Sequence, residues 1–118
     1  MSLFNVFEIS GSALTAQSVR LNTIASNMAN ADVVADRPEG VYRARHPVFS
    51  TVFSDTIMGQ RPAGVKVDHV MESKVEPRKE YAPGHPMAND DGYIWRSSVN
   101  TVDEMANMIS ASRSYQNS

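Results

Sequence analysis

The chain has 118 residues, which is enough for one domain with a modest core. Its 13 acidic and 11 basic side chains nearly balance, so charge does not point to nucleic acid or an anionic membrane as a partner. The absence of cysteine excludes disulfides, thiol nucleophiles and thiolate metal sites.

The charges are unevenly distributed along the chain. Residues 1–31 carry only Glu8 and Arg20, and residues 99–118 carry Asp103, Glu104 and Arg113. The other 19 of the 24 charged side chains lie in residues 32–98. The middle therefore has the composition of an ordinary solvated surface, whereas both ends indicate segments covered by protein.

The first predicted element is a helix from Phe4 to Met28. Its apolar and small residues follow heptad steps of three and four, which place them on one stripe. That stripe consists of Phe4, Phe7, Gly11, Leu14, Ser18, Leu21, Ala25 and Met28. After Phe4, one row is small and the other is large, an arrangement that lets a second helix approach closely. The segment "ASNMANAD" near the end of this helix favours fraying into a loop, because asparagine favours caps and turns.

The middle, residues 32–98, is predicted to form a small β domain held between two helices. Runs rich in β-forming residues span 42–53, 64–77 and 92–97, and "PEG", "QRPAG", "APGHP" and "NDDG" are read as turns. Pro47 indicates an edge or bulged strand. The expected core residues are Val41, Val48, Val52, Phe53, Val65, Val67, Val70, Tyr93 and Trp95.

The last predicted element is a helix over residues 99–118. One row joins Val99, Val102, Ala106, Ile109 and Arg113, and an adjacent row joins Met105, Met108, Ser112 and Tyr115. Asp103 and Glu104 lie in its first turn, where the helix dipole favours negative charge, and Asn100 or Thr101 is the expected cap. The fold class is therefore α+β. The two helices are expected to form an antiparallel coiled-coil pair, with a two-helix layer on a sheet as the alternative.

Catalytic, metal and cofactor sites are not indicated. His46, His69 and His85 have no second ligand at a recognised spacing, and no glycine-rich phosphate loop or nucleophile elbow is present in the sequence. We expect no enzyme activity, no cofactor and no nucleic acid partner.

Residues 1–10 lack a basic n-region, and no run approaches the ~18 apolar residues of a membrane span. Any export is therefore expected to occur without a cleaved signal.

Four segments in order carry a family resemblance: "GSALTAQSVRLNTIASNMANADV", "YRARHPVF", "YAPGHPMANDDGYI" and "EMANMISASRSYQ". Together they resemble the bacterial flagellar rod and hook family of axial proteins. Asn22, Asn27, Asn30 and Ala31 are similar to the family's Asn-Ala signature. The short middle is most similar to that of the proximal-rod members, and another rod or short hook-like subunit is the runner-up.

The resemblance implies a structural role in the basal body. Such proteins are exported by the flagellar type III apparatus and stack helically into the periplasm-spanning shaft that transmits torque. The implied partners are further copies, other rod proteins, and ring and export-gate components. The residues expected to pack helices or join subunits are Phe4, Phe7, Leu14, Leu21, Asn27, Met28, Asn30, Val102, Met105, Ile109, Arg113 and Tyr115. Arg113 is expected either to make an intersubunit contact or to flank the stripe in solvent.

Two further expectations follow. The family's C-terminal helix normally runs well beyond "SRSYQ", so we expect that the chain is truncated at Ser118. Both low-charge ends are expected to be mobile in the monomer and to order on assembly.

The rival from another class is a soluble export adaptor or chaperone that binds through its Met-rich helix. An adaptor would form a defined complex and no filaments.

Overall fold

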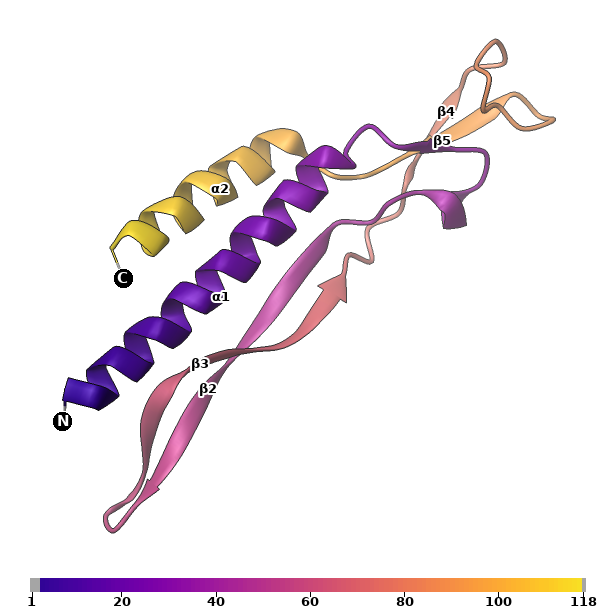
Figure 1. Ribbon diagram of the computed structural model, residues 1–118. Coiled ribbons are helices and arrows are strands. Elements are labelled where there is room, and N and C mark those ends of the chain that lie inside the picture. Colours follow the sequence, from indigo (N-terminus) through magenta and orange to yellow (C-terminus); the bar gives the residue numbers. More distant parts are fainter. Residues whose placement is uncertain (1–2, 118) are drawn as a thin grey trace.

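The computed structural model describes residues 3–117 and confirms an α+β fold (Figure 1). Helices α1 and α2 lie at the two ends of the chain, and the strands lie between them. The elements in order are α1 Leu3–Ala29, β1 Val34–Ala35, the 3-10 helix η1 Pro38–Gly40, β2 Arg45–Thr56, β3 Gly59–Glu72, β4 Arg78–Tyr81, β5 Tyr93–Arg96 and α2 Thr101–Gln116. Neither helix of the described chain is long and apolar enough to cross a membrane.

The molecule is elongated, with extents of 67 × 26 × 15 Å and a radius of gyration of 19.7 Å. A compact domain of this length has a radius of gyration of roughly 13–14 Å. The predicted β region does lie between the two helices in the sequence, but its strands are spread along an elongated molecule and do not form one compact unit. The hairpin of β2 and β3 runs beside α1, and the small sheet lies beyond the helices (Figure 1).

Helix α1 is the central element, because it packs against α2 and against both strands of the hairpin. Its buried residues are Ala16, Ile24 and Asn27. The buried residues of α2 are Glu104 and Ala111. Figure 1 shows that the first turn of α1 and the last turn of α2 lie at the same end of the molecule. Of these buried residues, Asn27 of α1 and Glu104 of α2 meet directly, through a hydrogen bond of 3.3 Å.

Strands β2 and β3 form one long antiparallel hairpin that turns at Ile57 and Met58. The "QRPAG" segment, predicted as a turn, lies inside β3, so that prediction is wrong. The pairing shifts register between Val52 and Phe53, which leaves Ala63 as an extra residue on β3. A bulge of this kind accommodates the proline and the glycine on either side of Ala63 within a strand.

A second register shift lies between Val48 and Phe49. It directly follows Pro47, for which the sequence predicted an edge or bulged strand. Because the hairpin has only two strands, both of them are edges. That prediction is confirmed.

The three-stranded sheet has the order β1-β5-β4, with both pairs antiparallel. Its most buried side chain is Ile94, with no exposed surface. Tyr93 and Trp95 lie on the opposite face and are only half-buried. There the Lys79 ammonium lies 4.2 Å from the centre of the Tyr93 ring, and the Tyr81 and Tyr93 rings meet edge to face at 5.1 Å.

The core lies at the junction of the helices and the sheet, where Ala31, Ala44 and Val99 form a buried cluster beside Tyr42. Among the predicted core residues, Val41 is buried, which confirms that expectation. Val48, Val65 and Val67 are half-buried.

Three predicted core residues are wrong: Val52, Phe53 and Val70 are 37%, 54% and 50% exposed. The physical reason is that these residues belong to a two-stranded hairpin rather than to a closed β domain. Such a hairpin has too few layers to bury all its apolar side chains.

Candidate functional site

The first turns of α1 expose a cluster of large apolar side chains. Leu3, Phe4, Val6 and Phe7 are 66%, 79%, 44% and 62% exposed, and we name them the α1 apolar end. Farther along the predicted stripe, Leu14, Leu21 and Met28 are half-buried, whereas Gly11 is exposed. Phe4 and Phe7 therefore do not pack within the chain. Their predicted role at a subunit interface stays a prediction.

Helix α2 exposes the predicted row of large apolar residues. Val102, Met105 and Ile109 are 70%, 52% and 57% exposed, and we name them the α2 apolar row. Tyr115 is 44% exposed, and Arg113 is exposed as well. The row is not among the buried residues of α2, which are Glu104 and Ala111, so its predicted role in helix packing or at a subunit interface stays a prediction. The spacing revealed an apolar face but not what covers it.

Exposed apolar side chains in such numbers are unusual on a monomeric protein, and contiguous patches of them typically mark a contact with another protein. They lie on the two low-charge helices and also on the hairpin, at Val52, Phe53, Ile57, Met58, Val70 and Met71. Because the hydrophobic effect favours removing such surfaces from water, both surfaces are suited to packing against further protein.

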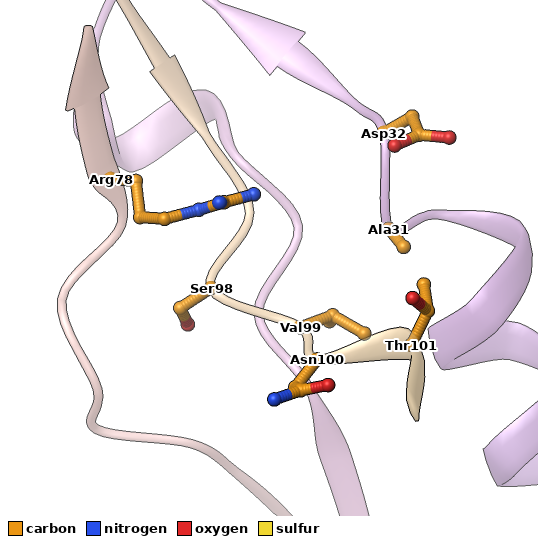
Figure 2. Close-up of a pocket in the computed structure, with 7 residues that line it drawn as sticks. All are labelled: Ala31, Asp32, Arg78, Ser98, Val99, Asn100 and Thr101. Atoms are coloured by element: carbon orange, nitrogen blue, oxygen red, sulfur yellow. The ribbon is translucent and has the colours of Figure 1, made fainter. Parts of the chain in front are cut away.

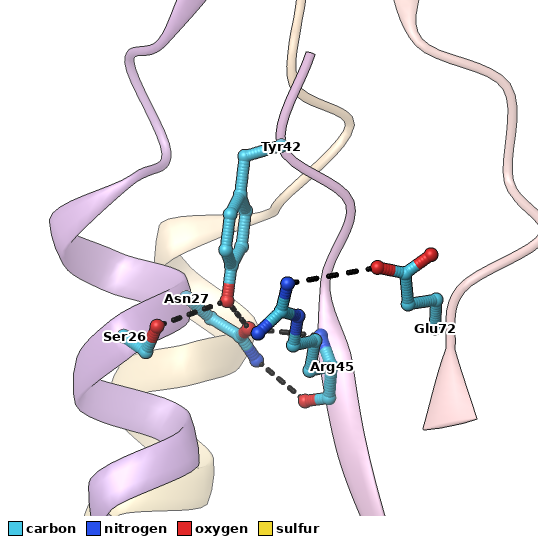
Figure 3. Close-up of polar contacts among 5 residues, drawn as sticks. All are labelled: Ser26, Asn27, Tyr42, Arg45 and Glu72. Carbon is cyan, nitrogen blue, oxygen red and sulfur yellow. Dashed lines mark hydrogen bonds and ion pairs between the residues drawn. The ribbon is translucent and has the colours of Figure 1, made fainter. Parts of the chain in front are cut away.

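Asn27 joins three elements at the C-terminal end of α1 (Figure 3). Its side chain is fully buried, and both atoms of its amide are satisfied. The Oδ1 atom accepts from the Tyr42 hydroxyl at 2.7 Å and from the Arg45 backbone N–H at 2.9 Å. The Nδ2 atom donates to the Arg45 carbonyl at 2.9 Å and to Glu104 Oε2 at 3.3 Å.

Further contacts surround this amide (Figure 3). The Ser26 and Tyr42 hydroxyls lie 3.2 Å apart, and the Arg45 guanidinium lies 5.6 Å from the centre of the Tyr42 ring. An Arg45 nitrogen also lies 3.7 Å from a Glu72 carboxylate oxygen. Fraying, one interpretation of the "ASNMANAD" segment, is therefore wrong for Asn27, which is a helical residue and holds the start of β2 and the first turn of α2.

Asn30, another expected site residue, plays a more local part. It is half-buried just beyond the end of α1, and its Nδ2 atom donates to the Ser26 carbonyl at 2.9 Å. The same carbonyl also accepts from the Asn30 backbone N–H at 3.1 Å, so Asn30 bonds twice to the last turn of the helix. The buried Ala31 follows and enters the core cluster.

The N-terminus of α2 is capped by Asn100, one of the two residues that the sequence offered. Its side-chain oxygen accepts from the backbone N–H groups of Val102 and Asp103 at 3.0 and 3.2 Å. An open cavity of about 400 Å³ adjoins this cap (Figure 2). Its lining comprises Ala31, Asp32, Arg78, Ser98, Val99, Asn100 and Thr101.

The histidines do not gather into a site. His69 lies 3.1 Å from its neighbour Asp68, and His85 accepts from the Met87 backbone N–H at 3.0 Å. Within residues 3–117, no group of three His, Asp or Glu side chains is placed to hold a metal ion.

Sequence reasoning missed the hairpin turn as an exposed apolar feature. Ile57 and Met58 are 103% and 97% exposed. The sequence offered one signal for this turn, namely Gly59, because glycine is common in tight turns. In the structure Gly59 has a φ of +113°, a conformation that favours glycine. "IMG" lacks the usual Asn-Gly or Asp-Gly pair of a hairpin turn, so this signal was weak.

Comparisons with known proteins find matching family models at both ends of the chain. The family model described as "Flagella basal body rod protein" matches residues 7–35, and that described as "Flagellar basal body rod FlgEFG protein C-terminal" matches residues 90–118. The chain is 49% identical over 116 residues to the flagellar basal-body rod protein FlgC of Salmonella typhimurium, covering 98% of this chain and 84% of the relative. The FlgC protein of Escherichia coli O6:H1 is 48% identical with the same coverage. That of Bacillus subtilis is 32% identical over 129 residues, covering 98% and 86%.

Proposed function

Since the chain belongs to the FlgC family of flagellar basal-body rod proteins and is a structural subunit of the proximal rod, we propose that it joins the rod through its two terminal helices. In this proposal the subunit is exported by the flagellar type III apparatus without a cleaved signal peptide. It then stacks helically into a periplasm-spanning shaft and helps to transmit torque. It has no enzymatic activity and no cofactor.

The observation that carries the proposal is the exposure of the α1 apolar end and the α2 apolar row. Phe4 is 79% exposed and Val102 is 70% exposed. The helices that carry them have few charged residues, although a helix that faces water usually has many. Burying one such side chain contributes about 1.5–3 kcal/mol. Several of them on each subunit supply a substantial driving force for association.

The helices act as an antiparallel coiled-coil pair in the assembled subunit. The placement of the first turn of α1 and the last turn of α2 at the same end of the molecule and the packing of α2 on α1 support this arrangement (Figure 1). The buried residues of the pair include Ala16, Ile24 and Ala111, whereas the α1 apolar end and the α2 apolar row face outward. The outward faces are then available to neighbouring helices.

Contacts between copies are heterologous, which means that different surfaces of the two copies meet. The α1 apolar end and the α2 apolar row are separate surfaces of different helices, and a head-to-tail contact between unlike surfaces builds an open helical assembly. Further copies, other rod proteins, and ring and export-gate components are the proposed partners.

Three segments of the chain have different roles in this proposal. Residues 1–31 and 99–118 form the axial helices, and residues 32–98 form the β-rich part outside them. The helices gain much of their order from packing against neighbours, because a helix without strong charge pairs depends on tertiary contacts. Both ends are therefore mobile in the dilute monomer and order on assembly.

A matched pair of substitutions tests this function. Ile109→Ser removes an apolar side chain from the α2 apolar row, and Ile57→Ser makes the same chemical change at the exposed hairpin turn. We expect Ile109→Ser to abolish concentration-dependent particle formation in analytical ultracentrifugation. The Ile57→Ser variant should retain it.

Two outcomes of this experiment contradict the proposal. Equal effects of the two substitutions would mean that exposed apolar area in general drives association. A defined complex that never grows with concentration would favour the adaptor class instead.

A further inference from the structure

We propose that the hydrogen bond between Asn27 and Glu104 is a rotational lock that fixes which face of α2 lies against α1. The lock keeps the α2 apolar row in solvent and a carboxylate inside. It acts within one chain, in every molecule whose α2 is packed on α1.

The orientation of α2 is the reverse of the one that hydrophobicity alone favours. Glu104 is 4% exposed, whereas Val102 and Ile109 are 70% and 57% exposed. At about 100° per residue, Val102 and Ile109 lie roughly 160° and 140° around the helix from Glu104. A half-turn of α2 about its axis would bury the apolar row and return the carboxylate to water. Some specific interaction must therefore hold the observed orientation.

Asn27 supplies that interaction because its amide cannot be turned around. The Arg45 backbone N–H can only donate, and it points at one side of the amide, where the Tyr42 hydroxyl also donates, so an acceptor is required there. This places Oδ1 toward β2 and leaves Nδ2 facing acceptors only. One Nδ2 hydrogen goes to the Arg45 carbonyl, and the other goes to Glu104.

Glu104 is the side chain of α2 that meets this requirement. Its carboxylate lies in the first turn of α2, where the positive end of the helix dipole offsets part of the cost of burying a charge. A rotated α2 would present Val102, Met105 or Ile109, none of which carries a strong acceptor. The Nδ2 hydrogen would then be unsatisfied in a site with no access to water, which is strongly unfavourable.

A buried polar pair of this kind selects one arrangement among several that have similar apolar contacts. The structure thus assigns Glu104 the part of a positioning residue. It orients the helix through Asn27 and makes no contact that needs a second chain.

Two methionines of α2 report the orientation directly. Met105 is 52% exposed and Met108 is half-buried, and they lie about 100° and 40° around the helix from Glu104. Brief treatment of the dilute full chain with hydrogen peroxide converts exposed thioethers to sulfoxides. Fragmentation mass spectrometry then gives the ratio of the Met105 to the Met108 oxidation rate.

The expected ratio is above 1 in the unchanged chain and in Glu104→Gln, because a glutamine carbonyl accepts the same hydrogen bond. In Glu104→Ala the ratio falls to 1 or below, while the amides of α2 exchange no faster than they do in the unchanged chain. Asn27→Asp keeps an acceptor for Tyr42 and Arg45 but removes the donor to Glu104. It should shift the ratio in the same direction as Glu104→Ala.

Either of two results overturns the lock. An unchanged ratio in both Glu104→Ala and Asn27→Asp would show that the pair does not set the orientation. A ratio near 1 with loss of amide protection in residues 101–116 would show that the pair only anchors α2 and does not orient it.

Discussion

Gly64 of β3 lies so close to Ser12 of α1 that a Cβ atom added at Gly64 would stand 2.5 Å from the Ser12 hydroxyl oxygen. The same hydroxyl accepts from the Val65 backbone N–H at 3.0 Å and donates to the Ile9 carbonyl at 2.9 Å. Gly64 also has a φ of +151°. Space, hydrogen bonding and backbone conformation therefore all favour glycine where the hairpin meets the first helix.

Replacing Gly64 with alanine should lower the free energy of unfolding by about 1–3 kcal/mol, because the new methyl group clashes and the backbone is strained. Urea unfolding followed by the fluorescence of Trp95, the single tryptophan, measures this. The control is Gly84→Ala, where no atom lies within 4 Å of the added Cβ. Equal unfolding midpoints for the two variants would contradict the close approach.

Replacing Asn27 with alanine should cost more than replacing Asn30. Asn27→Ala leaves the Arg45 N–H and carbonyl without the amide that they bond and the Tyr42 hydroxyl with Ser26 alone, and each unsatisfied group costs about 1–3 kcal/mol. Asn30→Ala removes a half-buried bond to the Ser26 carbonyl and should cost about 1 kcal/mol or less. The same urea assay compares them, and similar losses would mean that the junction contributes little.

Glu80 gives the fold a pH dependence that can be assigned to one contact. The Arg96 guanidinium donates a hydrogen bond to its carboxylate and, through that bond and its charge, lowers the Glu80 pKa below the ordinary 4.5. A lowered folded-state pKa stabilises the fold above pH 4.5, and this contribution is lost as the pH falls through the lowered value.

Carbon-13 NMR titration of the Glu80 carboxyl tests this assignment. Arg96→Gln should raise the Glu80 pKa toward 4.5, whereas Arg78→Gln should raise it less, because Arg78 is a smaller contributor that acts through charge alone. If the two substitutions shifted the titration equally, the hydrogen bond would not be the main cause.

Replacing Gly11 with alanine should change the stability of the monomer and its association with other copies in opposite directions. Gly11 lies exposed in α1 with no atom within 4 Å of an added Cβ, so Gly11→Ala should stabilise the helix by about 0.5–1 kcal/mol. Under the proposed function, the added methyl group weakens the close approach of a neighbouring helix. We therefore expect higher thermal stability together with weaker association. Stronger association in step with stability would place Gly11 outside the contact.

The helices could be predicted from sequence because a 3.6-residue period persists over several turns, as from Phe4 to Met28. The cap at Asn100 was also predictable, since its side chain matches the free N–H groups of a helix start. The face that each helix buries was not. Periodicity locates a stripe of large side chains such as Val102 and Ile109, but it does not say whether the same chain covers that stripe.

The β region shows the same limit at the level of single residues. In β5 the alternation of side chains was recognisable, yet the buried residue is Ile94 and not its neighbours Tyr93 and Trp95. Which of the two alternating sets of side chains is buried depends on the strands and loops around the strand. Pro62 and Gly64 suggested a turn because both usually interrupt strands, whereas a bulge retains them inside β3. Asn27 likewise had the composition of a loop, and only its partners reveal its role.

The central claim is that the terminal helices become ordered by packing against other subunits. Hydrogen–deuterium exchange by mass spectrometry on the full chain, from dilute solution to concentrations where particles form, tests it most directly. The account predicts rapid exchange in residues 1–31 and 99–118 when dilute and protection as particles appear, with residues 32–98 protected throughout. Protection of both ends in the monomer at every concentration would contradict it.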